Sequence, residues 1–331
     1  ARDMTYDNLF DAYKEQISGL LDGGVDALLI ETIFDTLNAK VAIDVAQTVM
    51  QEREIDLPIM LSVTVSDLAG RTLSGQTLNA FLASISEYNV FSVGLNCSFG
   101  ARQMKPYLKE LGKKAPYYIS AYPNAGLPNS MGLYDETAES MSPQIAEFID
   151  EGLVNIVGGC CGTTPEFIRQ LRACIDKTEK VYAEPKSGTF ITSGLKTLEI
   201  GQGLSLIGER INPTGKPRLK EALRQNNINY IIQEAVAQRD AGADILDVNV
   251  GLPEIDEAQM MVKTITELQA LLDLPLQIDS SEVAALEAGA RHYNGIPLIN
   301  SVNGKPASMA KYGGVILGLC LDEAGIPETA E

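Results

Sequence analysis

Three cysteines have the spacing and the surroundings of a metal site. Cys160 and Cys161 are adjacent within a glycine-rich run, and Cys97 closes an apolar run more than sixty residues earlier. Each cysteine follows a strand-like stretch and precedes a helix-like one, so parallel β/α units would bring all three sulfurs to the same end of a sheet. Three thiolates at one point make an incomplete zinc site with a fourth position for an exogenous ligand. A catalytic zinc needs that open position.

The other cysteines and the single histidine narrow the chemistry. Cys174 and Cys320 belong to no motif, and we expect them to pack as small apolar side chains. His292 is the only histidine, which removes most histidine-based catalysis and histidine-rich metal sites. Carboxylate, amide and thiolate chemistry remain.

Polar side chains stand at the ends of several predicted strands in the first half of the chain. Glu31 ends the apolar run Ala27 to Ile30, where a carboxylate could receive the ammonium group of an amino-acid substrate. A helix N-cap or a local salt bridge is the alternative role for Glu31. Asn96 and Asn124 also stand at strand ends, with loop shaping as an equally weighted alternative.

The second half repeats this arrangement with acids and amides. Asp247, Asp279 and Asn300 each lie at or near the end of a predicted strand. Active sites of β/α barrels gather at the carboxyl ends of strands, so these side chains are candidates for a second binding site. A hydrogen bond at the rim of a barrel is the alternative for any one of them.

An alternation of helices and strands must position these groups. In the first array we predict helices at 7–21, 37–51 and 165–176, and strands at 26–31, 58–64, 90–96, 117–122 and 154–159. In the second we predict strands at 205–209, 244–249, 275–279, 297–302 and 314–320, and helices at 217–241, 255–272 and 282–291. The segment between the arrays, 177–203, contains Pro185 and several glycines without a clear apolar period, which predicts a linker.

Two such arrays indicate an α/β protein with either two (β/α)₈ TIM-type barrels or two doubly wound sheets. A barrel needs eight strands, and each array offers five candidates. We therefore expect two barrels in tandem, both incomplete in this chain, with the chain an interior piece of a larger protein. Open barrel edges would make it prone to aggregation and inactive when expressed alone.

Composition excludes several classes of protein. The chain has 331 residues, 45% of them hydrophobic, and a net charge of −18. That charge leaves no basic face for nucleic acid. There is no apolar run long enough for a membrane helix and no secretory signal. Five cysteines in such a chain indicate reduced thiols and a cytoplasmic location.

The motifs together resemble cobalamin-dependent methionine synthase. In the first half the matching text is Ile30 to Lys40, Gly94 to Cys97, Pro123 to Pro128 and the Cys-Cys run. In the second half it is Gly208 to Asn212, Asp247 to Gly251, Ile278 to Ser281 and Ile299 to Asn303. Residues 1–176 resemble the C-terminal part of the homocysteine-binding barrel, and residues 204–331 resemble the start of the methyltetrahydrofolate-binding barrel.

The resemblance implies roles for the first module. Cys97, Cys160 and Cys161 would bind zinc, homocysteine would supply the fourth ligand through its thiolate, and Glu31 would bind the substrate ammonium. Zinc suits the task because a free thiol with a pKa near 8.5 is only a few per cent ionised at pH 7, and thiolate is the nucleophile.

For the second module the resemblance implies a pterin site. Asp279 and Asn300 would contact the pterin and assist catalysis, because the leaving N5 of the folate needs a proton or a hydrogen bond. Further substrate-binding residues nearby would be Glu209, Asn212, Asp247 and Asn249. A corrinoid would carry the methyl group from 5-methyltetrahydrofolate to homocysteine, held by a cobalamin-binding domain of the same parent protein that this chain lacks.

Two alternatives stay open from the sequence. One is a zinc-dependent homocysteine methyltransferase fused to a methyltetrahydrofolate–corrinoid protein methyltransferase. The other is a structural zinc or thiol-redox module, in which a fourth protein ligand or a disulfide closes the cysteine cluster.

Overall fold

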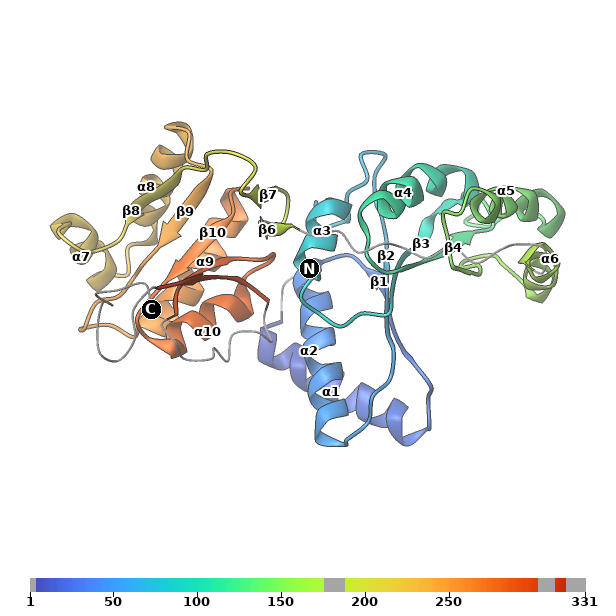
Figure 1. Cartoon of the computed structure of the whole chain (residues 1–331), viewed down its shortest axis with the longest axis horizontal. Helices are drawn as coiled ribbons and strands as arrows, with labels where there is room; N and C mark the ends of the chain where they lie inside the picture. The colour runs from blue at the N-terminus through green and yellow to red at the C-terminus, as the bar shows by residue number, and fades with distance from the viewer. Residues whose placement is uncertain (1–3, 176–187, 303–312, 320–331) are drawn as a thin grey trace, which may run out of the picture. The chain divides into compact units, whose positions relative to one another are not determined.

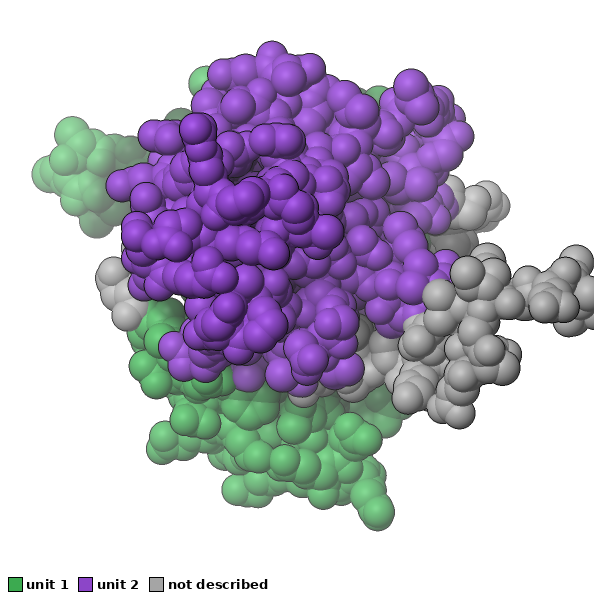
Figure 2. All heavy atoms as spheres, turned by 90° about the vertical axis from the view of Figure 1, so that its left-hand side faces the viewer, with its two compact units in different colours: residues 1–82, 89–187 green, residues 83–88, 188–331 purple. Residues whose placement is uncertain are grey.

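The chain forms two compact units. The computed structural model describes residues 4–175, 188–302 and 313–319. Unit 1 comprises Ala1–Leu82 and Asn89–Ser187, and unit 2 comprises Ala83–Tyr88 and Gly188–Glu331 (Figure 2). Within the described ranges, no helix combines the length and apolar character needed to cross a bilayer.

Unit 1 is built on a five-stranded sheet whose order, β1-β2-β3-β4-β5, is the order of the chain. The first four of these strands are labelled in Figure 1. Every neighbouring pair is parallel, and a helix lies between each strand and the next. The elements are α1 (Tyr6–Asp22), β1 (Leu28–Ile33), α2 (Thr36–Glu52), β2 (Ile59–Val63), α3 (Leu78–Ser84), β3 (Ser92–Gly100), α4 (Ala101–Lys114), β4 (Tyr118–Asn124), α5 (Ala138–Asp150), β5 (Ile156–Val157) and α6 (Pro165–Ile175).

Local sequence accounts for these boundaries. Asp35 follows β1 and caps α2, because its carboxylate accepts hydrogen bonds from the N–H groups of Leu37 and Asn38. Thr137 and Ser140 form a reciprocal capping box at the start of α5. The central strands β2 and β3 are mostly buried, including the apolar residues Leu61, Val63, Val93 and Leu95, which is typical of parallel strands.

Unit 2 repeats the plan. Its five-stranded sheet has the order β12-β11-β10-β9-β8, again sequential and again all parallel. The elements are β8 (Ile207–Ile211), α7 (Pro217–Arg224), α8 (Ile228–Asp240), β9 (Ile245–Val248), α9 (Glu257–Leu271), β10 (Leu276–Asp279), α10 (Val283–His292), β11 (Leu298–Val302) and β12 (Val315–Gly318).

The strand order bears on the fold class. In a TIM-type domain each parallel strand pairs with the next one in the chain, whereas a doubly wound sheet reverses its order at a switch point. Neither sheet shows a reversal among the described strands. The chain is therefore a mixed α/β protein whose parallel sheets are consistent with TIM-type domains. Closure of either sheet into a barrel stays a prediction.

One helix prediction was wrong. The segment 217–241 is not a single helix but two, α7 and α8, separated at Gln225, Asn226 and Asn227. Asn226 has a positive φ of 54°, a conformation that asparagine tolerates better than most residues. The side chain of Asn227 then accepts a hydrogen bond from the N–H of Tyr230 and starts α8.

Part of the segment predicted as a linker has regular structure. Strands β6 (Thr189–Thr192) and β7 (Thr197–Ile200) form an antiparallel hairpin. Its turn is held by Ser193, whose hydroxyl accepts from the N–H groups of Leu195 and Lys196. The predicted domain boundaries themselves stay a prediction.

Candidate functional site

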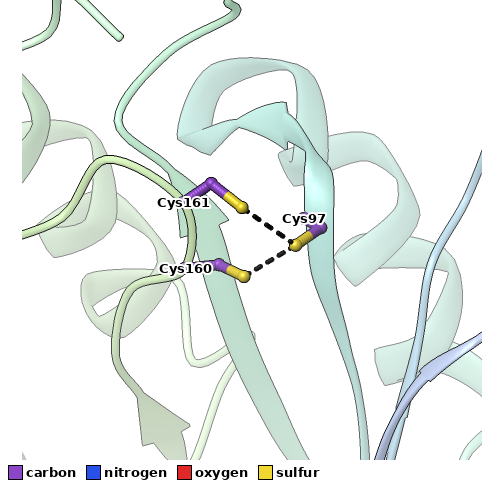
Figure 3. Close-up of side chains that lie close together, drawn as sticks. All are labelled: Cys97, Cys160 and Cys161. Carbon is purple, nitrogen blue, oxygen red and sulfur yellow. Dashed lines mark hydrogen bonds between the residues drawn. The ribbon is translucent and has the colours of Figure 1, made fainter. Parts of the chain in front are cut away.

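The three cysteines of unit 1 converge at the carboxyl end of its sheet (Figure 3). Cys97 lies in β3, and Cys160 and Cys161 lie in the loop after β5. The Sγ atom of Cys97 is 2.7 Å from that of Cys160 and 3.7 Å from that of Cys161. All three sulfurs lie within 4.8 Å of one another.

These spacings can be tested against zinc. Tetrahedral zinc with Zn–S bonds of about 2.3 Å holds its sulfurs about 3.8 Å apart. The Cys97–Cys161 pair already has this separation, and the Cys97–Cys160 pair needs to widen by about 1 Å. No histidine, aspartate, glutamate or other cysteine joins the cluster in the part of the chain that the structure describes. The donor set therefore fits a three-sulfur zinc site with one position left over.

The backbone around the cluster is shaped to aim the sulfurs. Cys97 and Ser98 both have positive φ angles, 58° and 57°. Two consecutive left-handed residues turn the chain, and the β3–β4 pairing shifts register at this point. The second loop is tied to the end of β4: the N–H of Cys161 donates to Oδ1 of Asn124, and the N–H of Cys160 donates to the carbonyl of Pro123.

Electrostatics at the cluster call for a cation. Burial raises the pKa of the Cys97 thiol to about 12, with hydrogen bonds to Cys160 and Cys161 and their charges adding to the effect. The Cys97 thiol therefore does not ionise on its own near neutral pH. A divalent metal reverses this preference, because coordination deprotonates a thiol outright.

A buried asparagine links the cluster to the predicted substrate strand. Oδ1 of Asn96 accepts hydrogen bonds from the N–H of Thr32 and the hydroxyls of Ser62 and Thr64, and its Nδ2 donates to Thr32. Glu31, the residue before Thr32, is exposed at the same end of the sheet as Cys97. Glu31 and Cys97 thus lie at the same end of the sheet, and Asn96 connects the segments of β1, β2 and β3.

Tyr134 also lies beside the cluster, and the sequence did not single it out. Gly162 has a φ of 81°, and a Cβ atom there would come 2.5 Å from Cβ of Tyr134. The phenol therefore packs directly against the loop that carries Cys161. Burial, followed by the neighbouring Cys161 thiol, raises the pKa of Tyr134.

A second polar cluster lies on one face of the unit 2 sheet. Nδ2 of Asn249 donates to Oδ2 of Asp279 at 2.9 Å. Asp279 is directly opposite Asn300 in the parallel β10–β11 pairing. Asp247 is fully buried and accepts a hydrogen bond from Nε2 of Gln277, the residue opposite it on β10. Asp247, Asn249, Asp279 and Asn300 therefore occupy three neighbouring strand ends.

The two remaining predicted residues of this cluster are more peripheral. Glu209 is exposed on β8, and Nζ of Lys216 donates to its carbonyl at 2.9 Å and lies 3.3 Å from its carboxylate. Asn212 uses its Oδ1 to accept from the N–H of Thr214 in its own turn. Lys216 was not expected, and nothing in its local sequence distinguishes it from other lysines.

Two carboxyl groups of this cluster, those of Asp247 and Asp279, have pKa values shifted toward the protonated form. Burial raises the pKa of Asp247 to about 7; the charges of Asp279 and Glu209 act in the same direction, whereas Gln277 and Lys216 oppose it. Burial also raises the pKa of Asp279, while the hydrogen bond from Asn249 lowers it. Perturbed acids gathered at strand ends are typical of binding and catalytic sites.

The remaining cysteines stand apart. Cys174 is a free cysteine, half-buried in α6 outside the three-sulfur cluster, in keeping with a packing role. Cys320 lies outside the described residues.

Comparison with known families separates the two halves of the chain. Residues 1–175 match the homocysteine S-methyltransferase family. Residues 208–315 match the pterin binding enzyme family.

Similar solved structures are distant. The homocysteine methyltransferase MmuM from Escherichia coli, in its apo form, is 21% identical with a TM-score of 0.41, over 53% of this chain and 60% of that one. A putative lyase/mutase from Burkholderia cenocepacia is 13% identical with a TM-score of 0.24, over 94% of this chain and 83% of that one. A 2,3-dimethylmalate lyase is 13% identical with a TM-score of 0.20, over 87% of this chain and 80% of that one. The chain spans only 60% of the length of the Escherichia coli protein, and TM-scores this low carry no weight for the fold.

Proposed function

The chain belongs to the homocysteine S-methyltransferase family, and from that premise we propose that it takes part in methyl transfer from 5-methyltetrahydrofolate to homocysteine through a corrinoid carrier. The observation that carries this proposal is the convergence of three cysteine sulfurs at the sheet end that also presents Glu31. Three sulfur ligands leave the fourth coordination position of a tetrahedral zinc ion open. The pterin match in the other half supports folate as the methyl source.

Unit 1 supplies the thiol acceptor site in this proposal. Cys97, Cys160 and Cys161 hold zinc, which when bound supplies a Lewis acid that favours the ionised form of a substrate thiol. Glu31 binds the ammonium group of homocysteine by a charge-assisted hydrogen bond. Asn96 positions Glu31 relative to the sulfurs through its hydrogen bonds to Thr32.

Unit 2 supplies the folate site. Carboxylates and amides suit the amino-pyrimidinone edge of a pterin, which presents several N–H donors. Asp247 and Asp279 accept such bonds, and Asn249 fixes Asp279 through its own amide. Asn300 is opposite Asp279 in the β10–β11 pairing, and we assign its amide N–H as the hydrogen-bond donor to the leaving N5 nitrogen. We assign the corrinoid to a separate domain, and no residue of this chain is proposed to hold it.

The zinc assignment is tested by substitution of single cysteines. We expect purified protein to hold one zinc ion per chain by elemental analysis. Cys97→Ser, Cys160→Ser and Cys161→Ser should each lose most of this zinc and the homocysteine-dependent activity, because each removes a sulfur ligand. Cys174→Ser is the matched control and should keep both. Stoichiometric zinc and full activity in all three cluster variants would remove the zinc hypothesis.

The 2.7 Å separation of the Cys97 and Cys160 sulfurs favours one second candidate, a thiol-redox centre. A disulfide has an S–S distance of about 2.05 Å, so a small movement would form it. Thiol titration of zinc-free and zinc-loaded protein after exposure to oxidised glutathione separates the two functions. A redox centre loses two thiols in both preparations, whereas a zinc site protects them in the loaded one.

A further inference from the structure

Strands β9 and β10 place two layers of polar side chains on one face of the unit 2 sheet. Side chains two residues apart on a strand point to the same face, so Gln277 and Asp279 share a face of β10. Asn249 follows the end of β9 and reaches this face through its hydrogen bond to Asp279. Gln277 is directly opposite Asp247 in the parallel pairing. The hydrogen bonds join Gln277 to Asp247 and Asn249 to Asp279, one pair in each layer.

The two amides in these layers differ in one respect. Asn249 is satisfied at both ends: its Nδ2 donates to Asp279, and its Oδ1 accepts from the N–H of Gly251 at 2.9 Å. Gln277 is satisfied at only one end. Its Nε2 donates to Asp247, but its Oε1 is buried and has no hydrogen-bond partner.

Other glutamines of unit 2 show that this is not the rule for a packed amide. Gln238 accepts from the N–H of Arg210 and donates to the carbonyl of Glu234. Gln269 accepts from the N–H of Asn294 and donates to the carbonyl of His292. Both have partners at both ends, as buried polar groups generally do. Gln277 is 5% exposed, and an unpaired acceptor at such a buried position costs the free protein stability.

The charged groups around Asp247 indicate what kind of hydrogen-bond donor would suit the unpaired Oε1 of Gln277. Asp247 is faced by Glu209 from β8, by Asp279 from β10 and by Lys216 from the segment after β8. From α8, which follows β8, only Ile231, Ala235 and Gln238 are buried, and none of them is charged. The free acceptor of Gln277 therefore stands beside carboxylates that outnumber the cations, a setting that favours a ligand rich in N–H donors.

We propose that Gln277 is a specificity-determining residue of the pterin site, an inference that rests on the function proposed above for unit 2. Its Nε2 holds the Asp247 carboxylate in place, and its Oε1 accepts a hydrogen bond from the amino-pyrimidinone edge of the pterin. Bound pterin thus satisfies an acceptor that the free protein leaves unpaired, and a ligand without that donor gains nothing from it.

Binding measurements on the whole protein test this assignment without turnover. Isothermal titration gives the Kd of 5-methyltetrahydrofolate and of an analogue whose pterin ring lacks the exocyclic amino group. We expect the wild-type protein to prefer the natural pterin. Gln277→Met, which keeps the length of the side chain without its amide, should weaken binding of the natural ligand by about tenfold or more. It should also reduce the preference over the analogue by about tenfold, because the lost acceptor no longer distinguishes the two.

Matched variants separate this role from general packing. Gln269→Met removes an amide with two protein partners away from the polar face and should leave both Kd values unchanged. Gln277→Glu keeps an acceptor oxygen and can share a proton with Asp247, so it should restore most of the preference for the natural pterin. Thermal melts monitor folding of each variant.

The outcomes distinguish this inference from the function on which it rests. If wild-type protein binds no folate, the pterin function itself fails. If wild-type protein binds both ligands equally, or if folded Gln277→Met keeps wild-type affinity and preference, the role of Gln277 is overturned while the pterin site stands. If Gln277→Met does not fold, Gln277→Glu decides: retained preference supports the assignment, and lost preference in a folded protein overturns it.

Discussion

Cys97 and Asp247 both occupy surroundings that disfavour their charged forms. Burial raises the pKa of the Cys97 thiol to about 12 and that of the Asp247 carboxyl to about 7. Cys97 also has a left-handed backbone conformation, which costs a non-glycine residue roughly 1 kcal/mol or more. Such groups lower the stability of the free protein, and ligand binding recovers part of the loss.

The sign of the Asp247 shift predicts a dependence of stability on pH. The native pKa is about 7 and the unfolded value is 3.8, so the native state binds more protons than the unfolded state between these values. The free energy of unfolding should therefore fall as pH rises from 4 to 7 and level off above 7. Asp247→Asn should remove this slope and be more stable than wild type at pH 8 by on the order of 2 kcal/mol.

Urea denaturation of unit 2 at pH 5 and pH 8 measures this difference. The gap between Asp247→Asn and wild type should be larger at pH 8 than at pH 5. Identical gaps at the two pH values would contradict a raised pKa for Asp247.

The order of elements was largely predictable from sequence, and the side-chain pairings were not. Each of the ten predicted strands of the two parallel sheets has a counterpart within a few residues, because buried parallel strands are short apolar runs. The break at Asn226 was missed, since apolar periodicity continues on both sides of it. The hairpin β6–β7 was missed because the segment around it is rich in glycine and has no clear apolar period.

The sites show the same limit. The three cysteines were identified from their spacing and from the strand-like stretch that precedes each motif. Gln277 was overlooked because its importance depends on being opposite Asp247, a register that only the folded sheet defines. One signal was available in the sequence: Gln277 is two residues before Asp279, so both side chains are expected on the same face of a strand. The sequence did not decide between a functional role and loop shaping for Asn96, because its hydrogen-bond partners lie 32 to 64 residues away in the chain.

At the level of elements, the close approach of β3 and β4 depends on one glycine. A Cβ atom on Gly94 would lie 2.0 Å from the backbone oxygen of Ser120, and backbone on a neighbouring strand cannot move aside cheaply. Gly94→Ala should therefore separate the two strands that hold Cys97 and Asn124, with a loss of several kcal/mol in the stability of unit 1.

Gly112→Ala is the matched control for this prediction. Gly112 lies in α4, and the nearest atom to a Cβ there is Cδ1 of Ile119 at 3.8 Å, an ordinary contact. Alanine should stabilise the helix by roughly 0.5–1 kcal/mol. Zinc content and thermal melts of both variants check the pair. Wild-type zinc and melting behaviour in Gly94→Ala would show that β3 and β4 tolerate a wider spacing.

For the molecule as a whole, the two polar clusters belong to different compact units. The proposed function divides accordingly into a folate half-reaction and a homocysteine half-reaction. Each half-reaction should then depend on the residues of one unit only.

Single variants test this division. Asp279→Ala should reduce methyl transfer from 5-methyltetrahydrofolate to cob(I)alamin while leaving transfer from methylcobalamin to homocysteine intact. Cys161→Ser should show the reverse pattern. Both half-reactions are measured with free cobalamin and the same protein preparation. Equal loss of both in either folded variant would contradict the division.

The sequential order of both sheets has a consequence for how the chain folds as it is made. Because β1 to β5 pair in the order in which they are synthesised, each new strand can add to the edge of strands already in place. A ribosome adds roughly 5–20 residues per second, far slower than a helix or a short loop forms. The sheet of unit 1 can therefore grow one strand at a time. Until the next strand pairs with it, the edge strand exposes unpaired N–H and C=O groups that can pair with other chains. Slowing translation between β3 and β4 would prolong the exposure of that edge, so synonymous codon choice in this stretch should affect yield more than codon choice within α2.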